Sequence, residues 1–181
     1  TPLEKFFLGS VSHKVAAEAC CSVRVVRPRV RPTDHRARIL IGLDGSDYSQ
    51  RAAEEVLQRR WNPATHVDLV TVIDSSLKSR VLGKAQPFEN PHAFDRIEDP
   101  IQSLLEATRE KFARQGLSVQ SHIFEGDPKR TLLHYAADWN VDCIFLGARG
   151  SEHGQRLYLG TLASAVCTRA HCTVEIVRAV A

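Results

Sequence analysis

The stretch GARGSEHGQRLYLGT, residues 147–161, begins where the apolar run VDCIFLG ends. The apolar run predicts a buried strand, and the residues from Thr161 onward have the spacing of a helix. A glycine-rich loop between a buried strand and a helix N-terminus presents main-chain N–H groups, which favour negative charge. The stretch therefore predicts a strand–loop–helix unit that contains an anion site.

Strands and helices alternate from residue 38 to the end of the chain. Short apolar or alternating runs predict five strands, and segments of helical periodicity between them predict four helices. Because each connection between parallel strands needs a crossover, this order predicts an α/β fold. We expect an open five-stranded parallel sheet with helices on both faces. The predicted strands are 38–44, 66–74, 117–125, 141–147 and 172–178.

Two aspartates mark the starts of predicted helices. Asp99 and Asp127 are each followed by proline, which is the pattern of an N-cap with proline at the first helical position. Residues 74–93 precede the first of these helices. They are polar and contain a glycine and two prolines, so they predict a long loop.

An internal repeat links the two ends of the chain. Residues 4–27 align without a gap with residues 155–178, at a shift of 151 positions. Both segments predict a helix that starts at glycine and a hydroxyl residue, followed by a valine-rich strand. The repeat predicts a tandem protein. In it, residues 1–28 are the tail of a preceding domain, residues 29–37 are a linker, and residues 38–181 form a domain.

Composition argues against several classes of function. A net charge of +3 on 181 residues does not indicate a nucleic-acid partner, and the arginine-rich linker is interpreted as a solvated segment. No apolar run is long enough to predict a membrane span. The five cysteines are odd in number and lack a C-x-x-C pair, which predicts reduced thiols in a cytoplasmic protein. The histidines show no metal-ligand spacing.

Candidate ligand-binding residues follow two of the predicted strands. In an open α/β sheet, ligands bind beyond the carboxyl ends of the strands, where the winding direction reverses. If strands 38–44 and 141–147 are neighbours, then Asp44, Gly45 and Ser46 face the glycine-rich loop across a crevice. Since a carboxylate repels phosphates, Asp44 is expected at the base or sugar end of a nucleotide.

The loop itself supplies the predicted anion site. Gly147 and Gly150 are expected to adopt backbone conformations closed to other residues and to point their N–H groups at phosphate oxygens. Gly160 and Thr161 open a helix whose dipole favours anions. The Thr161 hydroxyl is expected either to cap that helix or to donate to a phosphate, and Arg149 adds positive charge.

The spacing of these glycines follows the pattern G-x2-G-x9-G-[ST]. Together with an aspartate at the end of the first strand, the pattern resembles the universal stress protein family. The resemblance runs from about residue 38 to residue 180 and includes ILIGLDGS, LVTVID and EGDP. It recurs in part at residues 1–28. The four pattern positions are Gly147, Gly150, Gly160 and Thr161.

The resemblance implies a sheet ordered 3-2-1-4-5 and a site for ATP, or for ADP or AMP, between the first and fourth strands. Asp44 would contact the adenosine, Val72 would meet the adenine through its backbone, and the loop would hold the ribose and phosphates. Mg²⁺ is expected with the nucleotide, without a metal site made by side chains alone. The implied contacts are Asp44, Gly45, Ser46, Val72, Gly147, Arg149, Gly150, Gly160, Thr161 and Leu162.

One position departs from the family's pattern. Three places after the last glycine, where a hydroxyl residue often assists with the phosphates, this chain has Ala163. The phosphate affinity is therefore expected to differ from that of ATP-binding members of the family.

Three functions are compatible with these residues. The leading hypothesis is a regulatory stress-response domain that binds ATP as a ligand and is at most a slow ATPase, with His153 as the best candidate for that hydrolysis. The alternative is an interaction module without nucleotide, which works through its fifth-strand edge. An enzyme acting at the α-phosphate would need catalytic polar groups beside the glycines, and none stands out.

The fifth strand is expected to pair with a further strand at the edge of the sheet. In the family, the fifth strands of two domains pair antiparallel and form a dimer. Here strand 21–27 is expected to take the partner's place and cover strand 172–178, which hides a sheet edge. The arrangement would be a tandem pairing or a homodimer. The expected pairing residues are Val23, Val25, Val174 and Ile176.

Overall fold

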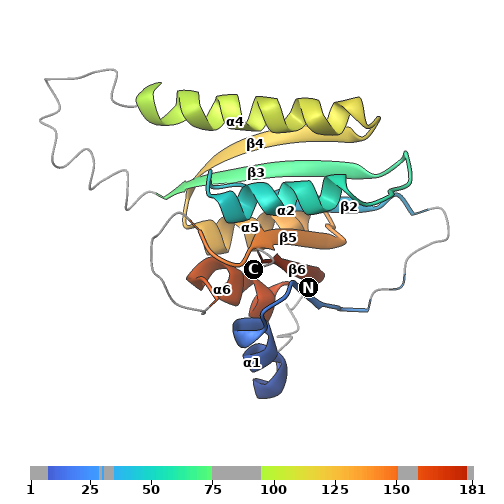
Figure 1. Ribbon diagram of the computed structural model, residues 1–181, viewed down its shortest axis with the longest axis vertical. Coiled ribbons are helices and arrows are strands. Elements are labelled where there is room, and N and C mark those ends of the chain that lie inside the picture. The colour runs from blue at the N-terminus through green and yellow to red at the C-terminus, as the bar shows by residue number, and fades with distance from the viewer. Residues whose placement is uncertain (1–7, 29, 31–34, 75–94, 151–158, 179–181) are drawn as a thin grey trace, which may run out of the picture.

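The computed structural model contains one six-stranded sheet (Figure 1). It describes residues 8–28, 30, 35–74, 95–150 and 159–178. The strands are β1 (Val23–Val25), β2 (Arg38–Gly42), β3 (His66–Asp74), β4 (Ser118–Gly126), β5 (Cys143–Gly147) and β6 (Thr173–Val177). Strands β2 to β6 are parallel to their neighbours, and β1 runs antiparallel to β6 at one edge.

The predicted α/β class is confirmed, and the predicted number of strands is corrected. The order along the sheet is β1-β6-β5-β2-β3-β4. Strands β2 to β6 are the five predicted ones, and they lie in the expected order 3-2-1-4-5. The sheet has a sixth strand because β1 adds to the edge of β6, whose main-chain N–H and C=O groups would otherwise lack a strand partner.

Helices cover both faces of the sheet. They are α1 (Ser10–Glu18), α2 (Asp47–Leu57), α4 (Asp95–Arg114), α5 (Pro128–Asp138) and α6 (Thr161–Arg169). In Figure 1, α2 lies in front of the sheet and α5 behind it. Because successive strand residues point to opposite faces, β2 supplies two cores. Ile39 and Ile41 pack in the core that contains α2 and α4, and Leu40 packs in the core that contains α5 and α6.

The start of α4 differs from the prediction. This helix begins at Asp95, so Pro100 lies inside it and Asp99 is not its N-cap. As the sixth residue of α4, Pro100 removes one helical hydrogen bond, while the apolar face of α4 is anchored by the buried Leu105 and Phe112. The second cap is as predicted, because the Asp127 carboxylate accepts a hydrogen bond of 2.8 Å from the Arg130 N–H.

The predicted loop, the helices and the cysteines are considered together. Asp74 is the last residue of β3, and the rest of the predicted loop 74–93 lies outside the described residues. In the described segments, every helix is too short or too polar to cross a bilayer. No disulfide joins the five cysteines, all of which lie in the described segments. Burial raises the pKa of Cys143 to about 12 and that of Cys167 to about 11, so both stay protonated at neutral pH.

A buried carboxylate lies where β1 meets β6. The ladder pairs Val23 with Ile176, Arg24 with Glu175, and Val25 with Val174. Glu175 is 3% exposed. It accepts hydrogen bonds from Arg24 at 2.7 Å and from Arg59, which lies just after α2. This carboxylate is therefore compensated from two sides.

Acid is expected to weaken the fold through Glu175. Burial favours a higher pKa for Glu175, but hydrogen bonds from Arg59 and Arg24 outweigh it and hold the pKa below its usual range. A carboxylate with a lower pKa in the folded state stabilises above its unfolded pKa of about 4.3, and this contribution disappears as the pH falls through the folded value. Urea unfolding from pH 7 to pH 3 measures the loss, which is expected to be smaller in Glu175→Gln. Parallel pH profiles would contradict the expectation.

Candidate functional site

The turn after β2 is fixed by its own side chains. Asp44 Oδ1 accepts hydrogen bonds from the Ser46 N–H at 3.0 Å and from the Ser46 hydroxyl at 2.6 Å. Ser46 is the N-cap of α2, and its hydroxyl oxygen accepts from the Ser49 N–H. Gly45 between them has φ of 82°, a left-handed conformation that favours glycine. The turn thus holds the Asp44 carboxylate in a set orientation.

The two ends of the loop after β5 are held together at Ala148. The Ala148 N–H donates to the Val177 carbonyl at 2.8 Å, which continues the sheet by one bond. The Gly160 N–H then donates to the Ala148 carbonyl, also at 2.8 Å. Residues 151–158 between these ends lie outside the described residues, and they include His153. The closure brings the start of α6 beside the end of β5.

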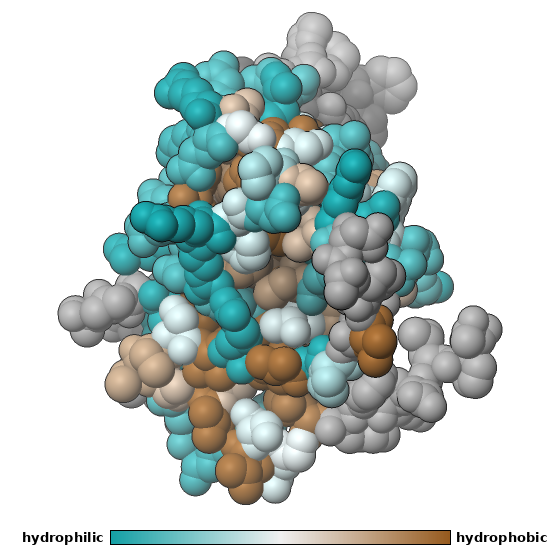
Figure 2. Space-filling view, turned by 90° about the vertical axis from the view of Figure 1, so that its right-hand side faces the viewer, coloured by the Kyte–Doolittle hydropathy of each residue, from teal (hydrophilic) through white to brown (hydrophobic). Residues whose placement is uncertain are grey.

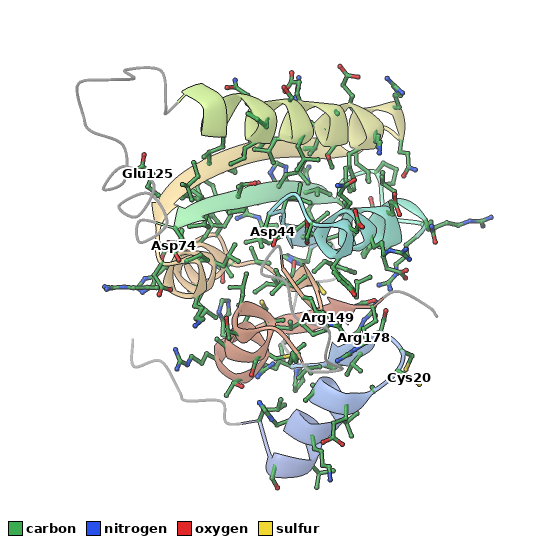
Figure 3. All side chains as sticks on the ribbon, turned by 60° about the vertical axis from the view of Figure 1, so that its left-hand side comes forward. Cys20, Asp44, Asp74, Glu125, Arg149 and Arg178 are labelled. Atoms are coloured by element: carbon green, nitrogen blue, oxygen red, sulfur yellow. The ribbon has the colours of Figure 1, made fainter. Side chains whose placement is uncertain are left out.

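The two segments face each other as the strand order requires. β2 and β5 are parallel neighbours, with Ile41 opposite Phe145. A Cβ on Gly150 would lie 2.7 Å from Asp44 Oδ2, so the carboxylate lies directly against the loop backbone. Figure 3 labels Asp44 after β2 and Arg149 in this loop. At the place where the crevice is predicted, an acidic group therefore lies on the β2 side and the N-terminus of α6 lies on the β5 side.

The reason for the glycines differs from the prediction. Neither Gly147 nor Gly150 has a left-handed φ, so conformational freedom is not what these positions require. Both are instead sites of close approach. A Cβ on Gly147 would lie 2.6 Å from the Tyr48 carbonyl carbon, and a Cβ on Gly150 would meet Asp44. Gly147 is thus needed for packing against α2, and Gly150 faces the crevice.

Arg149 leans on α2. Its Nη1 donates to the Tyr48 hydroxyl at 3.3 Å, and its guanidinium carbon lies 5.6 Å from the centre of the Tyr48 ring. A guanidinium at this distance from an aromatic face is attracted by the ring's quadrupole. The contact holds the Arg149 charge on the α2 side of the loop.

Val72 lies beyond the last hydrogen bond between β2 and β3. That bond runs from the Leu43 N–H to the Val70 carbonyl at 2.9 Å. β3 continues to Asp74 and pairs there only with β4, with Val72 opposite Phe124. Among the described residues, no strand pairs with the main chain of Val72 on the side where β2 ends.

The start of α6 is capped by backbone conformation alone. Gly160 is the N-cap, with φ of −60° and ψ of 155°, and no side chain caps this helix. Thr161 is the first helical residue and is exposed, so its hydroxyl does not act as the expected cap. Leu162 is half-buried, and Ala163 is 2% exposed within the core. Ala163 thus has a packing role, which a small apolar side chain fits.

Two site residues have a role that the sequence patterns did not indicate. Tyr48 contacts both Gly147 and Arg149, and the Ser49 hydroxyl accepts from the Asp44 N–H at 3.3 Å. Their only sequence signal is a place in the first turn of a helix that follows Asp44. Within the described ranges, no group of three or more histidine, cysteine or acidic side chains is placed to hold a metal ion.

Comparison with known proteins identifies the family of this fold. The sequence profile of the Universal stress protein family matches residues 35–178. The chain belongs to the universal stress protein family. Universal stress protein YxiE of Bacillus subtilis (strain 168) is 25% identical over 150 residues, which cover 78% of this chain and 98% of that protein.

Solved structures of universal stress proteins share this fold. The structure of hypothetical protein MJ0577 has a TM-score of 0.68 at 24% identity, and the match covers 79% of this chain and 96% of that one. A universal stress protein in complex with cAMP has a TM-score of 0.54 at 20% identity, over 79% and 97% of the two chains. An AMP-bound family protein from Arabidopsis thaliana has a TM-score of 0.50 at 20% identity, over 76% and 88%.

Proposed function

We propose that this universal stress protein domain binds an adenine nucleotide, with ATP as the leading ligand, in the crevice between β2 and β5. The observation that carries the proposal is the approach of Asp44 Oδ2 to the backbone at Gly150. A fixed carboxylate and a loop without a side chain at that point offer an acceptor for hydroxyl or amino groups. The structures with cAMP and AMP are evidence that this fold accommodates adenine nucleotides.

The two sides of the crevice differ in charge, as the two ends of a nucleotide do. The Asp44 carboxylate suits ribose hydroxyls or the adenine amino group, which donate hydrogen bonds. The N–H groups at the start of α6, from Gly160 to Leu162, suit phosphate oxygens because the helix dipole favours anions there. We assign the main chain of Val72, on the side away from β4, to the adenine edge, and Gly45 and Ser46 to the turn that supports Asp44.

Gly147 and Arg149 receive indirect roles in this proposal. Gly147 lets α2 pack against β5, which sets the distance between the two walls of the crevice. Arg149, held on Tyr48, adds positive charge beside the phosphates. Mg²⁺ is proposed to enter with the phosphates and not to occupy a site built by protein side chains.

Calorimetric titration with ATP, ADP, AMP and cAMP, each with and without Mg²⁺, tests the proposal. We expect one nucleotide to bind per chain, and AMP to retain much of the affinity because Asp44 recognises the adenosine. GTP is the matched control, since it has the same phosphates but a different base edge, and it is expected to bind more weakly. Absence of heat with all four adenine nucleotides, or equal affinity for GTP, would refute the proposal.

We propose in addition that α1 and β1 correspond to the last helix and strand of another repeat of this family, positioned beside β6. Val15 and Val26 are 52% and 67% exposed. Their counterparts at the repeat shift, Val166 and Val177, are 0% and 3% exposed. Figure 2 shows apolar side chains gathered at the end of the molecule where α1 lies. In a protein with a complete preceding repeat, both exposed valines are expected to be buried.

A further inference from the structure

The two ends of the chain form units of the same conformation. The N-terminal unit comprises residues 10–27, and the C-terminal unit comprises residues 161–178. The bounds of α1 and α6 differ by the 151 positions of the sequence repeat. Gly9 and Gly160 cap these helices with nearly equal angles, φ −59° and ψ 156° against φ −60° and ψ 155°. Each unit is thus a helix followed by a strand with one shared geometry.

The contacts between the units are reciprocal. Arg27 Nη2 donates to the Cys167 carbonyl at 2.6 Å. Its counterpart Arg178 donates through Nη2 to the carbonyl of Ala16, the counterpart of Cys167, also at 2.6 Å. Such pairs of equivalent contacts define a two-fold, isologous interface. Here the two-fold axis relates two segments of one chain.

The contacts of Arg27 and Arg178 lie away from the two-fold axis, and they do not determine which strand pairs with β6. Both arginines donate to main-chain carbonyls, which every residue carries. If two C-terminal units from different molecules paired in the same way, Arg178 would find the Cys167 carbonyl of the other molecule. The valine and isoleucine pairs of the ladder would be kept as well. These contacts therefore favour β1 and a second β6 equally as the partner at the β6 edge.

Residues on the axis do discriminate, because there each residue meets its own counterpart. In the ladder the axial pair is Arg24 and Glu175, with 2.7 Å between Arg24 Nη2 and Glu175 Oε2. Between the helices it is His13 and Ser164, with 3.2 Å between Nε2 and Oγ. Two paired C-terminal units would instead place Glu175 against Glu175. Like charges directly opposite each other in a ladder are destabilising.

Arg59 does not remove this difference. It binds Glu175 from its own domain, and its guanidinium carbon lies 5.2 Å from the centre of the Phe145 ring. Arg59 therefore accompanies Glu175 whichever strand pairs with β6. In the partner strand the axial residue changes from arginine in β1 to glutamate in a second β6. A second domain would bring its own Arg59 with that glutamate, but Glu175 would lose the cation that Arg24 places directly opposite it in the ladder.

We propose that Arg24 and Glu175 select the partner of β6, so that it pairs with the β1 of its own chain and not with the β6 of a second molecule. The partner that fits this edge is an antiparallel strand with a cation at its centre and β-branched residues on either side. Specificity then comes from an attractive pair in the correct arrangement and a repulsive pair in the competing one. The proposal does not rest on nucleotide binding.

Amide exchange in the full-length chain tests the attractive half. In Arg24→Glu, peptides 20–28 and 172–178 are expected to exchange roughly threefold to tenfold faster than in the wild type. Arg24→Lys is expected to stay within about twofold. Lys14→Glu makes the same charge change on an exposed, off-axis position of α1 and is also expected to stay within about twofold. Unchanged exchange in Arg24→Glu, or equal acceleration in Lys14→Glu, would overturn the proposal.

Sedimentation tests the repulsive half. Val25→Pro removes a ladder N–H from β1 and frees the β6 edge in the intact chain. With Glu175 present, this variant is expected to dimerise only at high concentration. With Glu175→Gln added, it is expected to dimerise at a concentration roughly tenfold lower. Equal dimerisation of the two variants, or none in either, would mean that Glu175 does not prevent self-pairing. Circular dichroism of both variants checks that the domain is folded.

Discussion

Gly147→Ala is expected to lower the free energy of unfolding by about 2–3 kcal/mol. The added Cβ would lie 2.6 Å from the Tyr48 carbonyl carbon and 2.8 Å from its carbonyl oxygen. These are backbone atoms in the first turn of α2, so they cannot rotate away. β5 cannot yield either, because Phe145 and its neighbours are fully buried. Urea denaturation followed by circular dichroism measures the loss.

Two other glycines serve as controls for Gly147. At Gly42, an added Cβ would meet Leu146 Cδ2 at 2.5 Å, and the end of a leucine side chain can move, so we expect a loss of about 1 kcal/mol. At Gly9, no atom of the described residues lies within 4 Å and φ is −59°, so the change is limited to the poorer helix cap that alanine makes, a loss of about 0.5–1 kcal/mol. Equal losses at positions 42 and 147 would show that the Tyr48 contact is not the cause.

Asp44→Asn is expected to weaken ATP binding roughly tenfold to a hundredfold while leaving the fold intact. Hydrogen bonds to a charged acceptor contribute about 1.5–3 kcal/mol, and asparagine replaces one carboxylate oxygen by a donor. Its remaining oxygen can still accept from the N–H and hydroxyl of Ser46, so the turn before α2 is kept. Calorimetry gives the affinity, and thermal unfolding shows whether the turn is preserved.

Asp127→Asn is the matched control for Asp44→Asn. Asp127 also accepts a main-chain hydrogen bond at the start of a helix, from the Arg130 N–H, but α5 lies on the other face of the sheet from α2. We expect unchanged affinity for ATP in this variant. If Asp44→Asn binds ATP as tightly as the wild type, or if both variants lose affinity alike, the role given to Asp44 is wrong.

The sequence predicted the parts of the fold that depend on periodicity. Alternation of Ile39, Leu40 and Ile41 between two cores, and the cap at Asp127, are properties of a few neighbouring residues. The start of α4 was not predictable in the same way. Pro100 satisfies the rule for a first helical position, yet α4 starts five residues earlier. A local rule cannot show how far tertiary packing extends a helix.

The candidate site was also only partly predictable from local sequence. The sequence predicted that β2 and β5 are neighbours, and the structure places Asp44 against Gly150 at their carboxyl ends; nucleotide binding there remains a prediction. The reason for Gly147 did not follow, because its contact with Tyr48 joins residues 99 positions apart in sequence, and only the packed structure brings them together. Similarly, Ala163 was noted in the sequence because it stands where a hydroxyl residue is common in the family. In the fold its side chain fills part of the core.

The antiparallel ladder of β1 and β6 joins segments 151 residues apart. Closing so long a loop has a high entropic cost, and contacts between distant parts of a chain form slowly. The edge of β6 also exists only after β6 has joined β5. Assembly of the sheet is therefore expected to finish at this ladder, with α1 and β1 joining a sheet in which β6 is already paired with β5.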